Sequence, residues 1–208
     1  MSYIEKIAFH VGRRDEVPNQ ELAKQLAEEQ NHAGIEEIAG YLQDKNKSIQ
    51  SDCIKVIYEI GYISPQLITK FAGSFIQLLD SKINRMVWGG MIALSTVAEY
   101  VPEDIWPHRE KIKNLIETGT VITNVSGVKT LINLSKAGGQ YYAGLIDDLF
   151  RLQQDCRNVD FAKRAEDMWP VIQPAHRKAY REILEERKPD LSNAAQKRLA
   201  KVIKSLAE

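Results

Sequence analysis

One short segment of the sequence combines residues that often make contacts between proteins. Arg85, Trp88 and Ile92 lie in it, and Arg85 is the sole charged residue between positions 84 and 98. A tryptophan beside an arginine on an otherwise uncharged helix has the composition of a binding hot spot. The alternative is that Trp88 folds over a neighbouring helix and packs there, as aromatic residues at helical spacing more often do.

Residue types that commonly catalyse reactions or bind metals show no such grouping. There is no H-E-x-x-H or C-x-x-C sequence, and the glycine pairs at 89–90 and 138–139 lack the rest of a phosphate-binding loop. The four histidines are dispersed along the chain: His10, His32, His108 and His176. We therefore expect no catalytic residue, no metal ion and no cofactor.

Charge and cysteine content narrow the classes of function further. Lys plus Arg and Asp plus Glu both number 28, so the formal net charge is zero. Nucleic-acid-binding proteins usually carry a basic excess, which makes a nucleic-acid partner improbable for this composition. The two cysteines do not form a disulfide framework, and we expect Cys53 to be a small buried core residue.

Targeting and membrane signals are not evident in the sequence. The first residues carry charges where a signal peptide needs an apolar run. The uncharged stretch at 86–98 is too short to cross a bilayer. These features predict a soluble, cytoplasmic chain with no membrane partner.

The elements that would position Trp88 follow from a repeat of 37 residues. Starting at Ile54, Ile57 and Ile60, each step of 37 arrives at another apolar triplet. The later triplets are Met91, Leu94 and Val97, then Val128, Leu131 and Leu134, then Ala165, Met168 and Val171. Such a period indicates stacked units, and the spacing within each triplet is helical. Each unit should hold a helix A, followed about 15 residues later by a helix B that carries the triplet.

The repeat predicts a single domain over 1–208. It would comprise an N-terminal cap at 1–31, four repeats over 33–172 and a C-terminal hairpin at 174–208. Pro65 and Pro102 should open A helices, and Gly61 and the 138–139 pair should end B helices. In the hairpin, Ser192 is a candidate N-cap, and the apolar stripe is expected at Ala200, Ile203 and Leu206.

The B segments resemble those of HEAT and armadillo-type repeats. In that pattern an aliphatic residue is followed four positions later by a small residue and then by an aliphatic pair. The matching residues are Met86, Gly90, Ala93, Leu94 and Val97 in one unit, and Ile49, Cys53, Val56, Ile57 and Ile60 in another. The arginine that often follows the opening aliphatic residue is replaced by Gln50, Val87 and Asn124, so no subfamily is indicated.

The resemblance implies an all-α fold. Its form would be a right-handed α-α superhelix, a HEAT-like solenoid of about five stacked helical hairpins with an atypical N-terminal helical cap. By similarity, the B helices of such repeats line the inner, concave surface.

A helical wheel selects the residues that each B helix should turn away from its apolar stripe. These candidate partner-binding residues are Arg85, Trp88, Ile92, Asp52, Lys55, Lys129 and Asn133. Trp88 and Ile92 would engage a protein or peptide. Its register would be set by Arg85, Lys55, Lys129 and Asn133. The predicted function is a non-catalytic interaction scaffold that binds its partner on the concave B-helix surface.

An alternative of another class is a DNA-binding repair protein, similar to the HEAT-like alkylated-base DNA glycosylases. These enzymes combine a basic track, groove aromatics and a carboxylate near the lesion. Trp88, Arg85, Asp52 and Lys129 would have to take those roles. The zero net charge weighs against this alternative.

Overall fold

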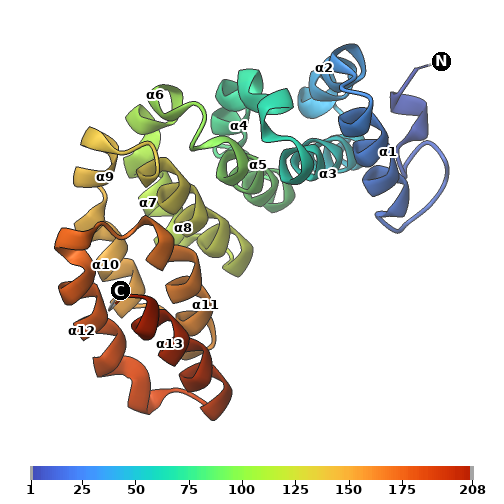
Figure 1. Ribbon diagram of the computed structural model, residues 1–208. Coiled ribbons are helices and arrows are strands. Elements are labelled where there is room, and N and C mark those ends of the chain that lie inside the picture. The colour runs from blue at the N-terminus through green and yellow to red at the C-terminus, as the bar shows by residue number, and fades with distance from the viewer. Residues whose placement is uncertain (1, 207–208) are drawn as a thin grey trace. The chain divides into compact units, whose positions relative to one another are not determined.

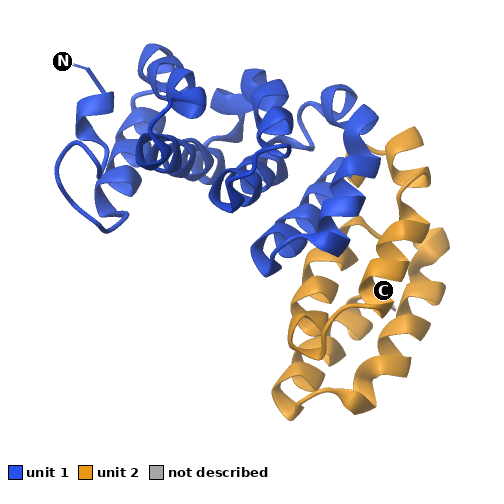
Figure 2. Ribbon diagram, turned by 180° about the vertical axis from the view of Figure 1, so that it is seen from behind, with its two compact units in different colours: residues 1–134 blue, residues 135–208 orange. Residues whose placement is uncertain are grey.

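The computed structural model describes residues 2–206. Within that range the fold is all-α and contains no strands (Figure 1). The chain forms two compact units, Met1–Leu134 and Ser135–Glu208 (Figure 2). The division falls at the end of the third repeat expected from the sequence. Each unit is described by itself below.

Unit 1 contains the N-terminal cap and three helical repeats (blue to green in Figure 1). The cap consists of η1 (Ile4–Lys6) and α1 (Val17–Glu28). The first repeat consists of α2 (His32–Gly40), η2 (Tyr41–Gln43) and α3 (Lys47–Ile63). The second consists of η3 (Pro65–Phe71), α4 (Ala72–Leu78) and α5 (Asn84–Val97). The third consists of α6 (Pro102–Ile105), η4 (Trp106–His108), α7 (Arg109–Thr118) and α8 (Val121–Ser135).

Unit 2 contains two further repeats (yellow to red in Figure 1). The first is α9 (Gly139–Ala143), α10 (Ile146–Gln154), α11 (Asn158–Met168) and η5 (Trp169–Val171). The second is η6 (Pro174–His176), α12 (Arg177–Arg187), η7 (Lys188–Asp190) and α13 (Asn193–Ser205). Their B helices, α11 and α13, pack against each other.

The segments at the A positions are more broken than the sequence pattern suggested. In the second and later repeats, the A position is divided into successive helical segments instead of forming a single amphipathic helix. Pro65 and Pro102 open η3 and α6, as expected for a residue without a backbone N–H. Pro107 then falls inside η4, where it cannot donate the hydrogen bond that would continue α6 into α7.

The apolar triplets of the 37-residue repeat form the cores of the two units. All twelve side chains are buried except Val171, which is partly exposed. Gly90, the residue before the second triplet, brings α5 close to its own A helix, α4. A Cβ on Gly90 would lie 2.9 Å from Leu78 Cβ and 3.0 Å from the Phe75 carbonyl oxygen, so α5 and α4 could not keep this distance with a larger residue.

Two details of the sequence prediction are wrong. Gly61 does not end its helix, because α3 continues to Ile63; it instead makes room for Thr96 of α5. Of the stripe expected in the last helix, Ala200 is exposed, Ile203 is partly exposed and only Leu206, the C-cap of α13, is buried. Leu199 and Val202 are buried in place of the first two, because a terminal helix need not keep the register of the inner repeats.

One predicted helix end is confirmed and another is displaced. The Ser192 side chain accepts a hydrogen bond from the Ala195 backbone N–H, which makes it the N-cap of α13. The helix α8 already ends at Ser135, and Gly138 is the N-cap of α9, which begins at Gly139. Gly138 and Gly139 have φ of 72° and 49°, a region that glycine adopts without strain.

Candidate partner-binding surface

The candidate surface is formed by the B helices α3, α5 and α8 of unit 1, which lie side by side. Gly89 lets α5 approach α3 closely, since a Cβ there would lie 2.7 Å from Ile54 Cγ1. Between α5 and α8, the Asn133 Nδ2 atom donates to the Ser95 carbonyl oxygen at 2.7 Å. We call the solvent-facing side of these three helices the B-helix surface; its accessible residues include Arg85, Trp88, Val121, Ile122, Val125 and Lys129.

An arginine stacked on a tryptophan lies on this surface. The Arg85 guanidinium carbon is 4.1 Å from the Trp88 ring centroid, within the range of a cation–π contact. The indole also lies next to Tyr58 of α3, with 6.3 Å between ring centroids and an interplanar angle of 47°. Arg85 and Trp88 are both partly exposed, whereas Tyr58 is buried. Trp88 thus packs against its neighbouring helix and still reaches the surface.

Glu16, the residue before α1, joins the cap to both α3 and α5. Its Oε1 accepts from Arg85 Nη2 at 2.6 Å, and its Oε2 is 2.9 Å from Lys55 Nζ. Lys55 is also paired with Glu59, at 2.6 Å between Nζ and Oε1. One carboxylate is therefore shared by two cations on adjacent helices.

The electrostatics of these groups follow from this pairing. Burial alone would raise the pKa of Glu16, but hydrogen bonds from Lys55 and Arg85 outweigh burial and hold that pKa below its ordinary value. Burial would lower the pKa of Lys55, but its hydrogen bonds to Glu59 and Glu16 raise that pKa above the usual range. Glu16 and Lys55 are thus both charged at neutral pH.

The helical wheel was wrong about the exposure of two predicted residues. Lys55 and Ile92, expected to face solvent, are 5% and 8% exposed. The wheel treats a helix as covered on one side, whereas a B helix packs against its own A helix and also against the B helices next to it. Side chains on its flanks are therefore covered, and only a narrow strip remains open.

The remaining predicted residues have different surroundings. Asp52 accepts hydrogen bonds from the Phe9 backbone N–H at 2.8 Å and from Asn19 Nδ2 at 2.9 Å, so this carboxylate holds the cap against α3. Asn133 is partly buried and links α8 to α5. Lys129 is exposed and, among the described residues, takes part in no ion pair.

Several residues of the surface were not among the predicted site residues. Glu16 lies in a segment without repeat register and 69 residues from Arg85, so nothing in the sequence pattern connects it to this surface. On α8, Val121, Ile122 and Val125 are 55%, 45% and 45% exposed. The 37-residue step relates Val125 to Trp88, which could have indicated this apolar strip.

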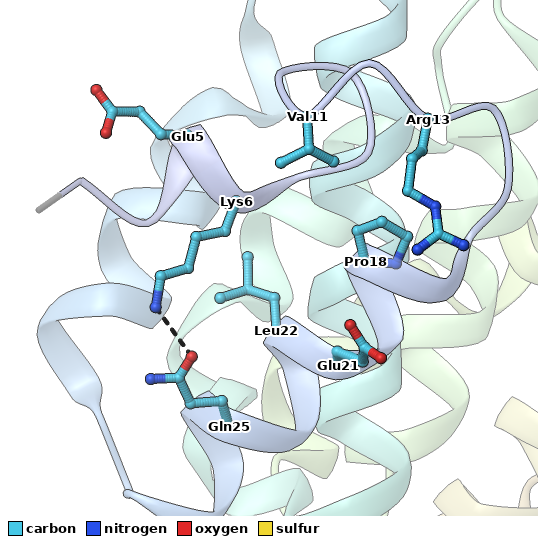
Figure 3. A pocket seen from close by; sticks show the side chains of 8 residues that line it. All are labelled: Glu5, Lys6, Val11, Arg13, Pro18, Glu21, Leu22 and Gln25. Carbon is cyan, nitrogen blue, oxygen red and sulfur yellow. Dashed lines mark hydrogen bonds between the residues drawn. The ribbon is translucent and has the colours of Figure 1, made fainter.

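A separate hollow of about 410 Å³ lies between the N-terminal segment and α1 (Figure 3). Acidic, basic and apolar side chains line it, and Lys6 Nζ donates to Gln25 Oε1 across one side at 3.0 Å. Its residues are Glu5, Lys6, Val11, Arg13, Pro18, Glu21, Leu22 and Gln25. Within residues 2–206 no group of three His, Cys, Asp or Glu side chains could hold a metal ion. No helix in this range is both long and apolar enough to cross a membrane.

Comparison with known proteins gives similarity in structure alone. No protein-family model matches the sequence, and no curated protein matches it either. Solved structures do match in fold. An engineered protein aligns with a TM-score of 0.67 at 15% identity, covering 100% of this chain and 97% of that one.

Designed armadillo repeat proteins are also similar. One, solved in complex with the peptide (KR)4, gives a TM-score of 0.66 at 14% identity and covers 91% of this chain and 87% of that one. Another, computationally designed for modular peptide recognition, gives 0.63 at 14% identity and covers 98% of each chain. The chain therefore has a helical-repeat fold of the armadillo and HEAT type, without a named subfamily.

Proposed function

We propose that this protein is a non-catalytic scaffold that binds a peptide segment of another protein on the B-helix surface of unit 1. Two observations carry the proposal: the Arg85–Trp88 stack on α5, and the exposed apolar strip of Val121, Ile122 and Val125 on the neighbouring helix α8. Large aromatic and arginine side chains dominate binding energy in protein interfaces.

The fold supports the same class of function. Repeat arrays present extended surfaces, to which successive B helices contribute equivalent positions. Of the structurally similar designed armadillo proteins, one was designed for modular peptide recognition and another is bound to a peptide. At 14% identity this likeness concerns the fold, so the choice of residues rests on the surface of this chain itself.

The DNA-repair alternative gains no support from the arrangement of its candidate residues. Asp52, its candidate carboxylate, accepts hydrogen bonds from the Phe9 backbone N–H and from Asn19 of the cap, so it is not placed to act on a base.

Selection from a random peptide library tests the proposal, because it requires no assumption about the sequence of the partner. Peptides selected on the wild-type chain should lose about tenfold or more in affinity for Trp88→Ala, as expected for an interface hot spot. The chain provides a matched control: Trp106, outside the B-helix surface, is also stacked under an arginine, with Arg109 at 4.4 Å.

The control variant Trp106→Ala should bind the selected peptides with wild-type affinity. Circular dichroism of both variants establishes that each retains its helical fold. Equal affinity of the Trp88→Ala variant and the wild type for every selected peptide would contradict the proposal.

A further inference from the structure

We propose, on the basis of the function above, that the peptide bound by the B-helix surface is acidic, and that one of its carboxylates takes the place of Glu16 on Arg85. The surface already holds a carboxylate at this position, and that carboxylate belongs to the protein itself. Its side chain is 46% exposed, so solvent and a ligand can reach it.

Release of Glu16 would affect its two cations differently. Lys55 keeps a second carboxylate, because Glu59 remains 2.6 Å away. Arg85 has no other ion pair among the described residues. Arg85 is therefore the cation that needs a new carboxylate, which its Nη N–H groups can bind.

The stacking on Trp88 prepares Arg85 for this role. A guanidinium held over an indole ring is restricted in its motion, so less conformational entropy is lost when a carboxylate binds to it. The indole N–H has no acceptor among the described residues and is not buried. The pair thus presents N–H donors, which match the acceptor oxygens of an acidic peptide.

The charges on the rest of the surface favour the same partner. Two carboxylates are already engaged within the protein: Asp52 by the cap and Glu59 by Lys55. Lys129 on α8 is exposed and, in the described part of the chain, has no ion pair. The unpaired charge is positive, and the strip of Val121, Ile122 and Val125 beside it suits apolar side chains.

Three peptides of equal length test the charge preference. Leucine alternates with aspartate in the first, with asparagine in the second and with lysine in the third. The dissociation constant of each dye-labelled peptide is measured by fluorescence anisotropy on the full chain at low ionic strength. We expect the aspartate peptide to bind about tenfold or more tightly than the asparagine peptide, and the lysine peptide to bind most weakly.

Two variants test the competition with Glu16. Glu16→Gln removes the internal carboxylate and should raise the affinity for the aspartate peptide about three- to tenfold, with a smaller change for the asparagine peptide. Arg85→Gln should lower the affinity for the aspartate peptide by about tenfold or more. Arg109→Gln, which alters the equivalent arginine–tryptophan stack outside the surface, should leave both affinities unchanged.

The outcomes separate this inference from the proposed function. Equal binding of all three peptides, lost in Trp88→Ala, would retain a peptide-binding surface and overturn the acidic preference. Preference for the lysine peptide would overturn it as well. Unchanged affinity in Glu16→Gln would show that Glu16 does not compete for Arg85. Absence of binding by all three peptides would overturn the acidic preference, while the library selection would still decide the proposed function.

Discussion

Glu16 and Arg85 lie 69 residues apart and meet at 2.6 Å between Oε1 and Nη2. This contact joins the residue before α1 to the first turn of α5. Because Glu16 also binds Lys55 of α3, a single side chain connects the cap to two repeats. Its effects on stability can be measured separately from its effects on binding.

Glu16→Gln should remove a pH-dependent part of the stability. The pKa of Glu16 is lower in the folded state than its ordinary value of 4.5, so the ionised carboxylate stabilises the fold. This stabilisation is fully present above pH 4.5 and is lost as the pH falls through the lowered folded-state pKa. The free energy of unfolding of the variant should be lower by roughly 0.5–1 kcal/mol near neutral pH, since the pair is partly exposed.

Urea denaturation at a series of pH values measures this difference. It should stay constant from about pH 7 to about pH 5 and then shrink towards about pH 3. Glu21→Gln is the control, because the exposed Glu21 has no ion pair among the described residues. A difference that grows on acidification would contradict the assigned pairing.

Gly89→Ala should destabilise unit 1 by about 1–3 kcal/mol, because the added methyl group would overlap Ile54 and force α3 and α5 apart. The added Cβ would lie 2.7 Å from Ile54 Cγ1 and 3.1 Å from its Cγ2. Thermal denaturation followed by circular dichroism gives the change. In the control Gly73→Ala, nothing lies within 4 Å of the new Cβ, so the variant should be as stable as the wild type or more so. Equal effects of the two substitutions would rule out a steric cause.

Asn19→Ala should weaken the attachment of the cap by about 1–3 kcal/mol. Asn19 is fully buried, accepts from the Ala8 backbone N–H at 2.9 Å and donates to Asp52 at 2.9 Å. Its removal leaves the buried N–H of Ala8 without an acceptor. Amide hydrogen exchange in the Asn19→Ala variant should be faster at residues 7–11 than in the wild type. Asn84 is exposed, so the control variant Asn84→Ala should leave exchange at residues 7–11 unchanged. Wild-type protection in the Asn19 variant would contradict this role.

The two cysteines should resist thiol reagents in the folded protein. Burial raises the pKa of the Cys53 thiol and also that of Cys156, so little reactive thiolate forms at pH 8. Cys53 is 0% exposed and Cys156 8%, and each belongs to a different unit. Mass spectrometry after maleimide labelling in increasing urea should show Cys156 modified before Cys53. Rapid labelling of Cys53 without urea would contradict its burial in α3.

The fold could be predicted from the sequence because positions that are buried in one repeat are apolar at the same place in the next repeat. Ile54, Met91 and Val128 occupy one position in successive B helices, and each side chain is buried as the period required. The broken A segments were harder to predict, because a proline such as Pro107 is compatible both with a helix start and with an interruption.

The site was predicted less well than the fold. The segment around Arg85 and Trp88 was found because its composition differs from that of the other B helices. Lys55 was assigned to solvent because a helical wheel contains no information about the neighbouring helix that covers it. The binding roles of these residues stay a prediction until they are measured.

The sequence by itself determined the helices, their period and the apolar stripes, because these depend on residues close together in the chain. Only the tertiary structure decided which polar side chains reach the surface and which are paired. Glu16 meets Arg85 and Lys55 through the packing of three helices, and no local pattern in the sequence records such a contact.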